Sequence, residues 1–434
     1  MPLPSSSPAS PIPVAIIGAG PAGLLAAQRL SAAGIAVQVF DAMPTAARKF
    51  LLAGRGGLNL THSEDFAPFL SRYRQASAWL EPLLREFGRD AVRAWAQDLG
   101  VETFIGTSAR VFPSSMKAAP LLRAWLHRLR QPTAASSVPV VFHMRQRWLG
   151  WGDDAKGAGK VLRFATPEGE KTVHAQAVLL ALGGASWPRL GSRGDWVGVL
   201  RDQGVKVLDL EAANCGFDAA GRAGAGWTER LQELAGQPLK NIVLHWPDAQ
   251  GKPQERRGEC VLTATGLEGS VLYAASGDLR EAIKQNGSAS LTLNLLPDAD
   301  TEQILAVLAA PRKGQSLSSV LKKRFKLSAL KVALLYELLS PETLQDPAQL
   351  AASLQHLPIK LLRTRPVAEA ISSAGGVALD ALDENLMLRT KAGVFCAGEM
   401  LDWEAPTGGY LLTASMATGA RAAAGIAAYL QQAR

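Results

Sequence analysis

Three glycines near the N-terminus have a spacing that suits phosphate chemistry. They form the pattern GxGxxG directly after residues 14–17, an apolar run that predicts a buried parallel strand. In such a turn the first glycine makes the tight bend, the second lets a pyrophosphate reach the backbone, and the third lets the following helix pack on the strand. We therefore predict a dinucleotide site here rather than a structural turn. The residues expected at it are Gly18, Gly20, Pro21, Ala22 and Gly23.

An acidic residue completes this pattern. The helix predicted after the glycines ends at Gly34, residues 35–40 predict a second strand, and Asp41 closes that strand. A carboxylate at this distance can accept hydrogen bonds from ribose hydroxyls, while the helix N-terminus offers free N–H groups to the phosphates. No arginine directly follows Asp41, which argues against a 2′-phosphate on the ribose.

A second glycine cluster follows, in "ARKFLLAGRGGLNLTHSE" (residues 47–64). Its glycines alternate with basic residues, and no acid occurs before Glu64. A basic loop after the second strand can wrap the far side of an extended dinucleotide, which we favour over a solvated loop. The residues expected to take part are Arg48, Lys49, Gly54, Arg55, Gly56, Gly57 and Asn59.

A third glycine-rich segment lies near the C-terminus, where "APTGGYLLTASMATG" occupies residues 405–419. The preceding "AGVFCAGEM" predicts a strand, and the Gly-Gly pair opens a helix of small residues. Glycine is costly in regular structure because it loses the most backbone freedom on folding. The pair therefore indicates that another group comes close to the backbone at this helix start.

These segments resemble the YhiN/BaiN-like flavoproteins (the aminoacetone oxidase type), a bacterial family of NAD(P)/FAD-dependent oxidoreductases. The resemblance rests on "VAIIGAGPAGLLAAQRL", "KFLLAGRGGLNLTHSE", "GTSARVFPSSMKAAPLLRAWLHRL", "VLLALGGASWPRLGSRGDWVG" and the C-terminal "AGGVALD…GGYLLTASMATG". It covers the chain except for a loosely matching middle, about residues 205–350. It implies non-covalent FAD as the cofactor.

The resemblance also implies that the C-terminal segment returns to the nucleotide domain and lies under the isoalloxazine ring. A helix N-terminus there would stabilise negative charge on the reduced ring. The strand "AVLLALGGASWP" implies a further return of the sheet to the cofactor. The additional cofactor-binding residues expected are Gly183, Gly184, Gly398, Glu399, Asp402, Gly408, Gly409, Tyr410 and Leu411.

Two positions depart from the family pattern. Leu58 stands where many members have a cysteine, and the family's GGYN is here GGYL, ending at Leu411. A mechanism that needs a thiol in this loop is therefore in doubt for this chain, and its substrate can differ.

The predicted fold class is α/β, with a two-part Rossmann-like FAD-binding domain interrupted by an inserted β-barrel plus helical domain. The expected boundaries are a disordered tail over 1–12, the first FAD-domain part over 13–204, and the second over 356–434. The insert comprises a β-barrel-like part over 205–300 and a helical part over 301–355. We expect residues 70–130 to be helical, with residues 109–118 joining helices on the substrate side.

Composition and residue spacing exclude several other classes of protein. A hydrophobic fraction of 47% and a charged fraction of 19% over 434 residues fit a globular protein of two or three domains. The three cysteines lie far apart and no HExxH spacing occurs, so neither a metal site nor a disulfide framework is expected. We find neither a secretory signal nor an apolar run long enough for a membrane helix, and expect a cytoplasmic protein without a membrane partner.

Flavin chemistry needs only a few protein groups, because the cofactor performs the hard step. We predict reduction of a C=C bond, with Arg55, Arg110 and Lys117 as candidate proton donors or anchors. Substrate classes within the family include steroid-like enones and uracil in ribosomal RNA, and both stay open. So does the reductant, which is NAD(P)H or another protein, since no second GxGxxG occurs. The alternative is a nucleic-acid-binding flavoprotein whose FAD is structural or senses redox state.

A basic segment favours an anionic partner. Residues 312–331, "RKGQSLSSVLKKRFKLSALK", carry seven basic residues and no acid, and the whole chain has a net charge of +8. Such a run can bind RNA phosphates or be an ordinary solvated helix. Phe325 within it can stack on a base, although a place in the core is favoured.

Overall fold

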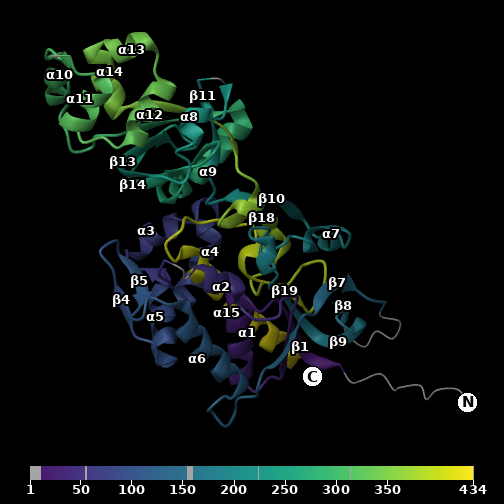
Figure 1. The fold of residues 1–434 in the computed structure, drawn as a ribbon. Helices are drawn as coiled ribbons and strands as arrows, with labels where there is room; N and C mark the ends of the chain where they lie inside the picture. Colours follow the sequence, from purple (N-terminus) through teal and green to yellow (C-terminus); the bar gives the residue numbers. More distant parts are fainter. Residues whose placement is uncertain (1–10, 54–55, 154–159, 223, 313, 434) are drawn as a thin grey trace, which may run out of the picture. The chain divides into compact units, whose positions relative to one another are not determined.

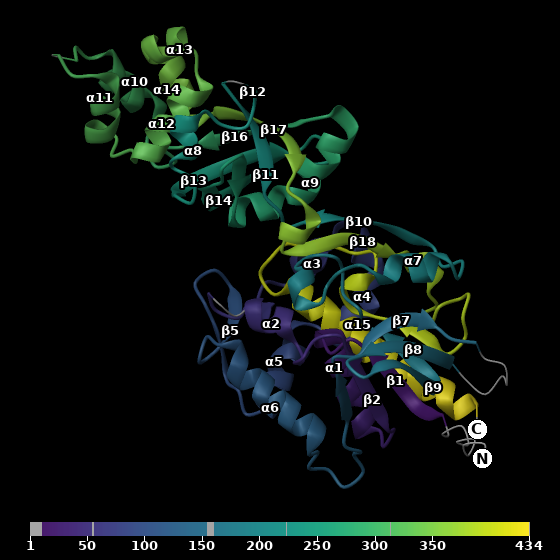
Figure 2. The same ribbon diagram turned by 45° about the vertical axis from the view of Figure 1, so that its right-hand side comes forward.

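The computed structural model describes residues 11–53, 56–153, 160–222, 224–312 and 314–433. The chain divides into two units: residues 212–371 form an inserted unit, and the residues on either side of them form the cofactor unit. Of the tail expected over 1–12, residues 1–10 lie outside the described chain, and Ile12 already begins the first strand. Figure 1 and Figure 2 show the elements of each unit.

The cofactor unit is built on a seven-stranded sheet in which β6, β2, β1, β9, β8 and β7 follow one another, with β19 also paired to β9. The strands β6, β2, β1, β9 and β19 run parallel, whereas β7 and β8 add an antiparallel arm. Val14 and Ile16 of β1 are fully buried, as a parallel strand covered on both faces requires. The bounds are β1 Ile12–Ile17, β2 Val37–Asp41, β6 Val141–Met144, β7 Arg147–Trp151, β8 Lys160–Thr166, β9 Gly169–Leu180 and β19 Val394–Cys396.

Two helices that are far apart in sequence lie side by side against this sheet. They are α1 (Pro21–Ala32), which follows the glycine turn, and α15 (Tyr410–Gln432), near the C-terminus (Figure 1). A Cβ atom on Gly419 of α15 would come 2.3 Å from the Ala22 carbonyl oxygen of α1. The small residues of α15 therefore serve a close helix–helix approach.

The cofactor unit also contains a small sheet of order β3, β5, β4. Residues 70–130 are therefore not all helical. Residues 109–118 do lie between two helices, but Arg110–Pro113 within them is a strand that pairs with strands on both sides. The strands are β3 Thr61–His62, β4 Thr103–Ile105 and β5 Arg110–Pro113. The helices are α2 Arg48–Ala53, α3 Phe66–Ser71, α4 Ser77–Glu86, α5 Arg89–Asp98, α6 Ala118–Arg130 and α7 Trp196–Arg201.

The chain leaves and re-enters the cofactor unit along one pair of strands. These are β10 (Val207–Ala213) and β18 (Ser372–Val377), which form a two-stranded sheet.

The inserted unit contains a closed six-stranded barrel, as the predicted fold class requires. The order β11, β15, β14, β13, β16, β17 closes because β17 also pairs with β11, while β12 extends the sheet from β11. Residues 357–364, expected in the second part of the cofactor domain, are thus a barrel strand. The bounds are β11 Phe217–Gly221, β12 Gly224–Ala225, β13 Pro238–Pro247, β14 Pro253–Leu262, β15 Gly266–Glu268, β16 Ala289–Asn294 and β17 Leu357–Thr364.

Helices complete the inserted unit, which has its own apolar core. They are α8 Glu229–Gln232, α9 Ser270–Asn286, α10 Thr301–Ala309, α11 Leu317–Arg324, α12 Ala329–Leu338, α13 Pro341–Gln345 and α14 Pro347–Gln355. In neither unit does a helix of the described residues have the length and apolar character needed to cross a bilayer.

Candidate functional site

The GxGxxG turn has the geometry that its spacing predicts. Gly18 has a φ of +110°, and a Cβ atom there would lie 2.1 Å from the Ala181 carbonyl oxygen. A Cβ atom on Gly23 would lie 2.1 Å from the Gly18 carbonyl oxygen, so that glycine lets α1 pack on β1. Gly20 is different: its backbone is extended, and a Cβ atom would meet nothing within 4 Å. Packing within the protein therefore gives no reason for a glycine at position 20, whereas a phosphate group close to the backbone does.

Asp41 fixes the loops around this turn. Its two carboxylate oxygens accept hydrogen bonds from the backbone N–H groups of Ala19 and Met43, both at 2.7 Å. Burial raises the pKa of Asp41, although these two N–H groups oppose the effect. Each oxygen retains a lone pair, so the carboxylate can still accept hydrogen bonds from a ligand hydroxyl.

Lys49 and Glu399 join α2 to the loop after β19. The Lys49 ammonium lies 2.6 Å from a Glu399 carboxylate oxygen and donates to the Ser186 hydroxyl, also at 2.6 Å. The other Glu399 oxygen accepts from the Ser373 backbone N–H at 2.9 Å. Two of the residues predicted from distant segments are therefore brought into direct contact, with polar groups suited to ribityl hydroxyls beside them.

One cavity runs along these features. Its walls include the glycine turn, Asp41, Lys49 and Glu399. Four of the residues that line it also carry a buried side-chain atom without a hydrogen-bond partner among the described residues, and each such atom costs about 1–3 kcal/mol if it stays unpaired. They are Arg48 Nε, Gln146 Oε1, Trp148 Nε1 and Ser192 Oγ. An open phosphate cradle and a ribose acceptor in one cavity fit an extended dinucleotide.

The Gly-Gly pair is approached by the protein itself. Gly408 and Gly409 both have positive φ, and a Cβ atom on Gly409 would lie 2.4 Å from the Thr61 Cα atom of β3. A Cβ atom on Gly408 would lie 3.6 Å from Arg110 Nε. The pair therefore lets the start of α15 pack on the small sheet and brings Arg110 to the same point.

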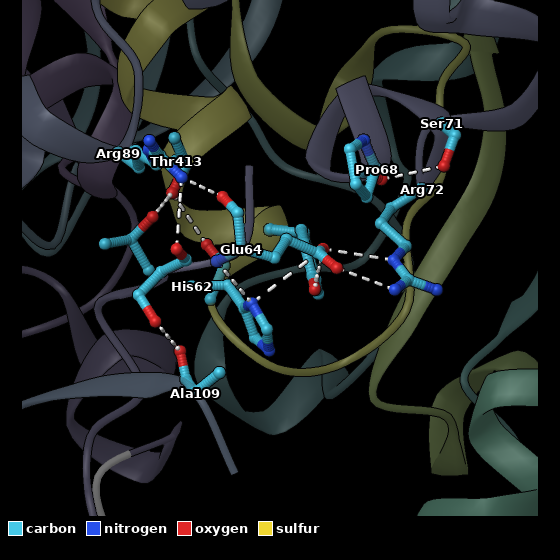
Figure 3. Close-up of polar contacts among 12 residues, drawn as sticks. His62, Glu64, Pro68, Ser71, Arg72, Arg89, Ala109 and Thr413 are labelled. Carbon is cyan, nitrogen blue, oxygen red and sulfur yellow. Dashed lines mark hydrogen bonds and ion pairs between the residues drawn. The ribbon is translucent and has the colours of Figure 1, made fainter. Parts of the chain in front are cut away.

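Tyr410, the first residue of α15, belongs to a polar cluster that sequence reasoning missed. Figure 3 labels Glu64, at the centre of this cluster, together with Arg72 and His62. The Tyr410 hydroxyl donates to Glu64, which also accepts two hydrogen bonds from Arg72, at 3.1 and 2.7 Å. The ring of His62 stacks on Tyr410 with 5.3 Å between centroids, and Arg89 donates to the Glu64 carbonyl oxygen. Glu64 thus ties together β3, α3, α5 and the beginning of α15.

The electrostatics of this cluster keep Glu64 charged. Burial alone would raise the pKa of Glu64, but the hydrogen bonds from Arg72 and Tyr410 bring it below its ordinary value. Burial and the bond to Glu64 raise the pKa of Tyr410 well above the usual tyrosine range. Burial lowers the pKa of His62, so this ring is neutral near pH 7. Tyr410 therefore anchors α15 through its hydroxyl.

The predicted residues divide into three groups. The cavity lining contains Gly18, Gly20, Pro21, Ala22, Asp41, Arg48, Lys49, Gly183, Gly398 and Glu399. The residues that do not line it are Gly23, Gly56, Gly57, Asn59, Gly184, Asp402, Gly408, Gly409, Tyr410, Leu411, Arg110 and Lys117. Gly54 and Arg55 lie outside the described residues.

Several of the second group have a clear position. Asn59 has a buried amide oxygen without a partner among the described residues. Arg110 is the cross-strand partner of His62, so both side chains leave the same face of the small sheet. Lys117 is exposed at the N-cap of α6, which separates it from the other candidates. Sequence reasoning did not identify Arg72, Gln146, Trp148 or Ser192. Of these four, Ser192 lies in a recognisable pattern, the glycine-rich segment "LGSRG", which could have indicated a place at the cavity.

Comparison with known proteins identifies the family of this chain and the cofactor of that family. The model of the HI0933-like protein Rossmann domain matches residues 12–425. The chain belongs to this family. Its cofactor is FAD, as the sequence predicted, and the protein is an FAD-dependent oxidoreductase. Among the described residues, no group of three or more His, Cys, Asp and Glu side chains is placed to hold a metal ion.

Two relatives and one solved structure extend this comparison. The 3-dehydro-bile acid delta(4,6)-reductase of Clostridium scindens is 24% identical, over 94% of this chain and 97% of the relative. The ribosomal RNA dihydrouridine synthase of Escherichia coli is also 24% identical, over 91% of this chain and 93% of the relative. The solved structure of a flavocytochrome c3 fumarate reductase in its open conformation matches 98% of this chain and 79% of the reductase chain, with 13% identity and a TM-score of 0.50. At this identity the match describes a similar fold alone.

Proposed function

We propose that this family member reduces a carbon–carbon double bond of an unsaturated carbonyl compound. The names of both relatives describe saturation of such a bond, one in a bile acid and the other in a uracil base. Each relative aligns over nine-tenths of this chain or more. Both substrate types carry a carbonyl oxygen conjugated with the double bond, and this shared feature defines the substrate class.

The observation that carries the proposal is the position of Arg110. It stands beside Gly408 at the N-terminus of α15, and no acidic side chain of the described chain pairs with it. An unpaired guanidinium next to the positive end of a helix is suited to a carbonyl oxygen that gains negative charge during reduction.

FAD, once reduced, would supply the hydride for such a reduction. The chain itself must hold the carbonyl oxygen and deliver a proton to the second carbon. Arg110 can hold the oxygen through its fixed N–H groups. Tyr410 cannot supply the proton while its hydroxyl donates to Glu64. We expect the reducing equivalents to come from NAD(P)H or from another protein.

The test is anaerobic. The flavin is bleached with NADH or NADPH, and its reoxidation is followed with a steroid-type enone and with unmodified ribosomal RNA. Arg110→Ala should slow reoxidation at least tenfold at saturating acceptor and leave FAD content unchanged, while Lys117→Ala serves as the control. Reduced flavin that neither acceptor reoxidises would contradict the proposal.

RNA is the second candidate substrate, because the end of α11 and the residues directly after it present a basic surface. This surface consists of Lys322, Lys323, Arg324 and Lys326, which are all exposed, and no acid among the described residues pairs with them. The sequence suggested a longer basic segment, but Lys313 lies outside the described residues. Lys331 is buried and donates to two carbonyl oxygens, and Phe325 packs against the core of the inserted unit.

This second candidate has its own test. RNA affinity is titrated at several salt concentrations for the wild type and for a variant with Lys322, Lys323 and Arg324 changed to Ala. Contact with phosphates predicts a shallower salt dependence in the variant. An unchanged salt slope, or no binding at low salt, would favour a small-molecule substrate.

A further inference from the structure

The inserted unit contains a cavity that shares no residue with the cofactor cavity. Its volume is about 460 Å³, and its walls are the start of β13, the loop after β16, and the turn between α11 and α12 together with the first turn of α12. All residues that line it lie within 212–371, so it is a feature of the inserted unit alone. Three of them are lysines: Lys240, Lys326 and Lys331.

Lys331 places a buried positive charge in the wall of this cavity. Its side chain is 8% exposed and donates hydrogen bonds to the backbone carbonyl oxygens of Asn241 and Leu295, at 3.1 and 2.7 Å. Both of these residues line the cavity as well. An ammonium group has three N–H donors, so these two carbonyl oxygens leave one donor over. Among the described residues, no acidic side chain forms an ion pair with Lys331.

This arrangement is unfavourable for the protein by itself. A buried ammonium group loses hydration, and neutral carbonyl oxygens replace that hydration only in part. Burial accordingly lowers the pKa of Lys331 to about 8, so the side chain is still charged near pH 7. An anion in the cavity would supply the opposite charge that the described chain does not.

The other charged residues of the lining leave the cavity positive. Lys240 and Lys326 are exposed, and neither pairs with an acid in the described part of the chain. The acidic residue of the lining, Asp298, is already neutralised by Arg257, at 2.7 Å. The N-terminal end of α12 adds the positive end of a helix dipole.

A phosphate group fits these observations, because its oxygens accept charge-assisted hydrogen bonds from several ammonium groups at once. We propose that this cavity is a second ligand site, which binds a phosphate group through Lys240, Lys326 and Lys331. The phosphate can belong to a free nucleotide or to an RNA backbone, since the same ammonium groups would hold either. Lys326 also belongs to the basic surface at the end of α11, so a chain with several phosphates would reach both. The proposal does not depend on the reduction of a double bond.

The experiment measures Kd at low salt for the full-length protein with its FAD bound. The probes are inorganic phosphate, adenosine 5′-monophosphate, and an oligoadenylate of about ten nucleotides. None of them contains uracil or an enone, so binding does not report on the site of reduction.

The decisive variant is Lys240→Ala combined with Lys326→Ala, because both side chains are exposed and the fold does not depend on them. We expect it to bind inorganic phosphate about tenfold more weakly. The matched control is Lys252→Ala combined with Lys360→Ala, which removes the same charge from exposed lysines of the inserted unit that do not line the cavity. Lys331→Met should weaken phosphate at least as much; it also leaves two carbonyl oxygens unpaired, so its thermal unfolding is measured alongside.

Weaker phosphate binding in the cavity variants, with the control unchanged, supports the site. An oligoadenylate that binds much more tightly than the mononucleotide, and loses affinity in the same variants, identifies the ligand as a polynucleotide. Equal affinities for the two identify it as a free nucleotide. A wild type that binds no inorganic phosphate at millimolar concentration would overturn the proposal, as would unchanged affinity in the double cavity variant or an equal loss in the control.

Discussion

Gly20→Val separates the cofactor role of the glycine turn from its structural role. Gly20 has an extended backbone, and a Cβ atom there would meet no protein atom within 4 Å, so the first atom of a valine side chain has room. The cost to the fold is the loss of a favourable N-cap residue, about 1 kcal/mol. Gly23→Ala is the matched contrast, because its Cβ atom would lie 2.1 Å from the Gly18 carbonyl oxygen. Overpacking of that kind costs about 1–3 kcal/mol or more.

The assay is thermal unfolding of flavin-free protein, with and without added FAD. At an FAD concentration of 100 times Kd, the cofactor adds about 2.7 kcal/mol to the stability of the wild type. Gly20→Val should unfold within a few degrees of the flavin-free wild type but gain nothing from FAD, and it should purify without colour. Gly23→Ala should unfold at a lower temperature even without FAD. The reasoning fails if Gly20→Val retains FAD fully, or if its flavin-free form is less stable than that of Gly23→Ala.

Three further predictions concern the other parts of the fold. Asp41→Ala should weaken FAD by about 1.5–3 kcal/mol, the value of a hydrogen bond to a charged group, measured by titration of flavin-free protein; unchanged affinity would remove the ribose assignment. Arg72 and Tyr410 lower the pKa of Glu64 in the folded state, so this residue stabilises the wild type above the ordinary glutamate pKa, and the stabilisation is lost as pH falls below it. Glu64→Gln should remove this pH-dependent part of the free energy of unfolding, measured by denaturant unfolding at several pH values. The same decrease of stability with falling pH in both proteins would argue against it. Replacement of residues 212–371 by a short linker should preserve FAD binding, because every residue that lines the cavity belongs to the cofactor unit; the flavin content of the purified protein checks this, and a colourless but folded product would contradict it.

The nucleotide half of the site could be predicted because its signals are local. The turn at Gly18, the helix start and Asp41 follow one another within a single strand–helix–strand segment, so their spacing alone constrains their geometry. The alternation of strand-like and helical stretches similarly indicated a split Rossmann domain with an inserted barrel. Its boundary was wrong at 356, because residues 357–364 are a strand that only its pairing with β16 and β11 assigns to the barrel.

Other features were decided by tertiary contacts between distant segments. The sequence indicated that something approaches the backbone at Gly409, but only the folded chain shows that it is Thr61, 348 positions earlier in the sequence (409 − 61). Glu64 joins Arg72 and Tyr410 only because α15 returns to the small sheet. Gln146 and Trp148 carry no recognisable pattern, since what distinguishes them is a buried polar atom without a partner. Spacing along the chain determines a turn, whereas the partner of a side chain depends on which remote strand or helix the hydrophobic core brings beside it.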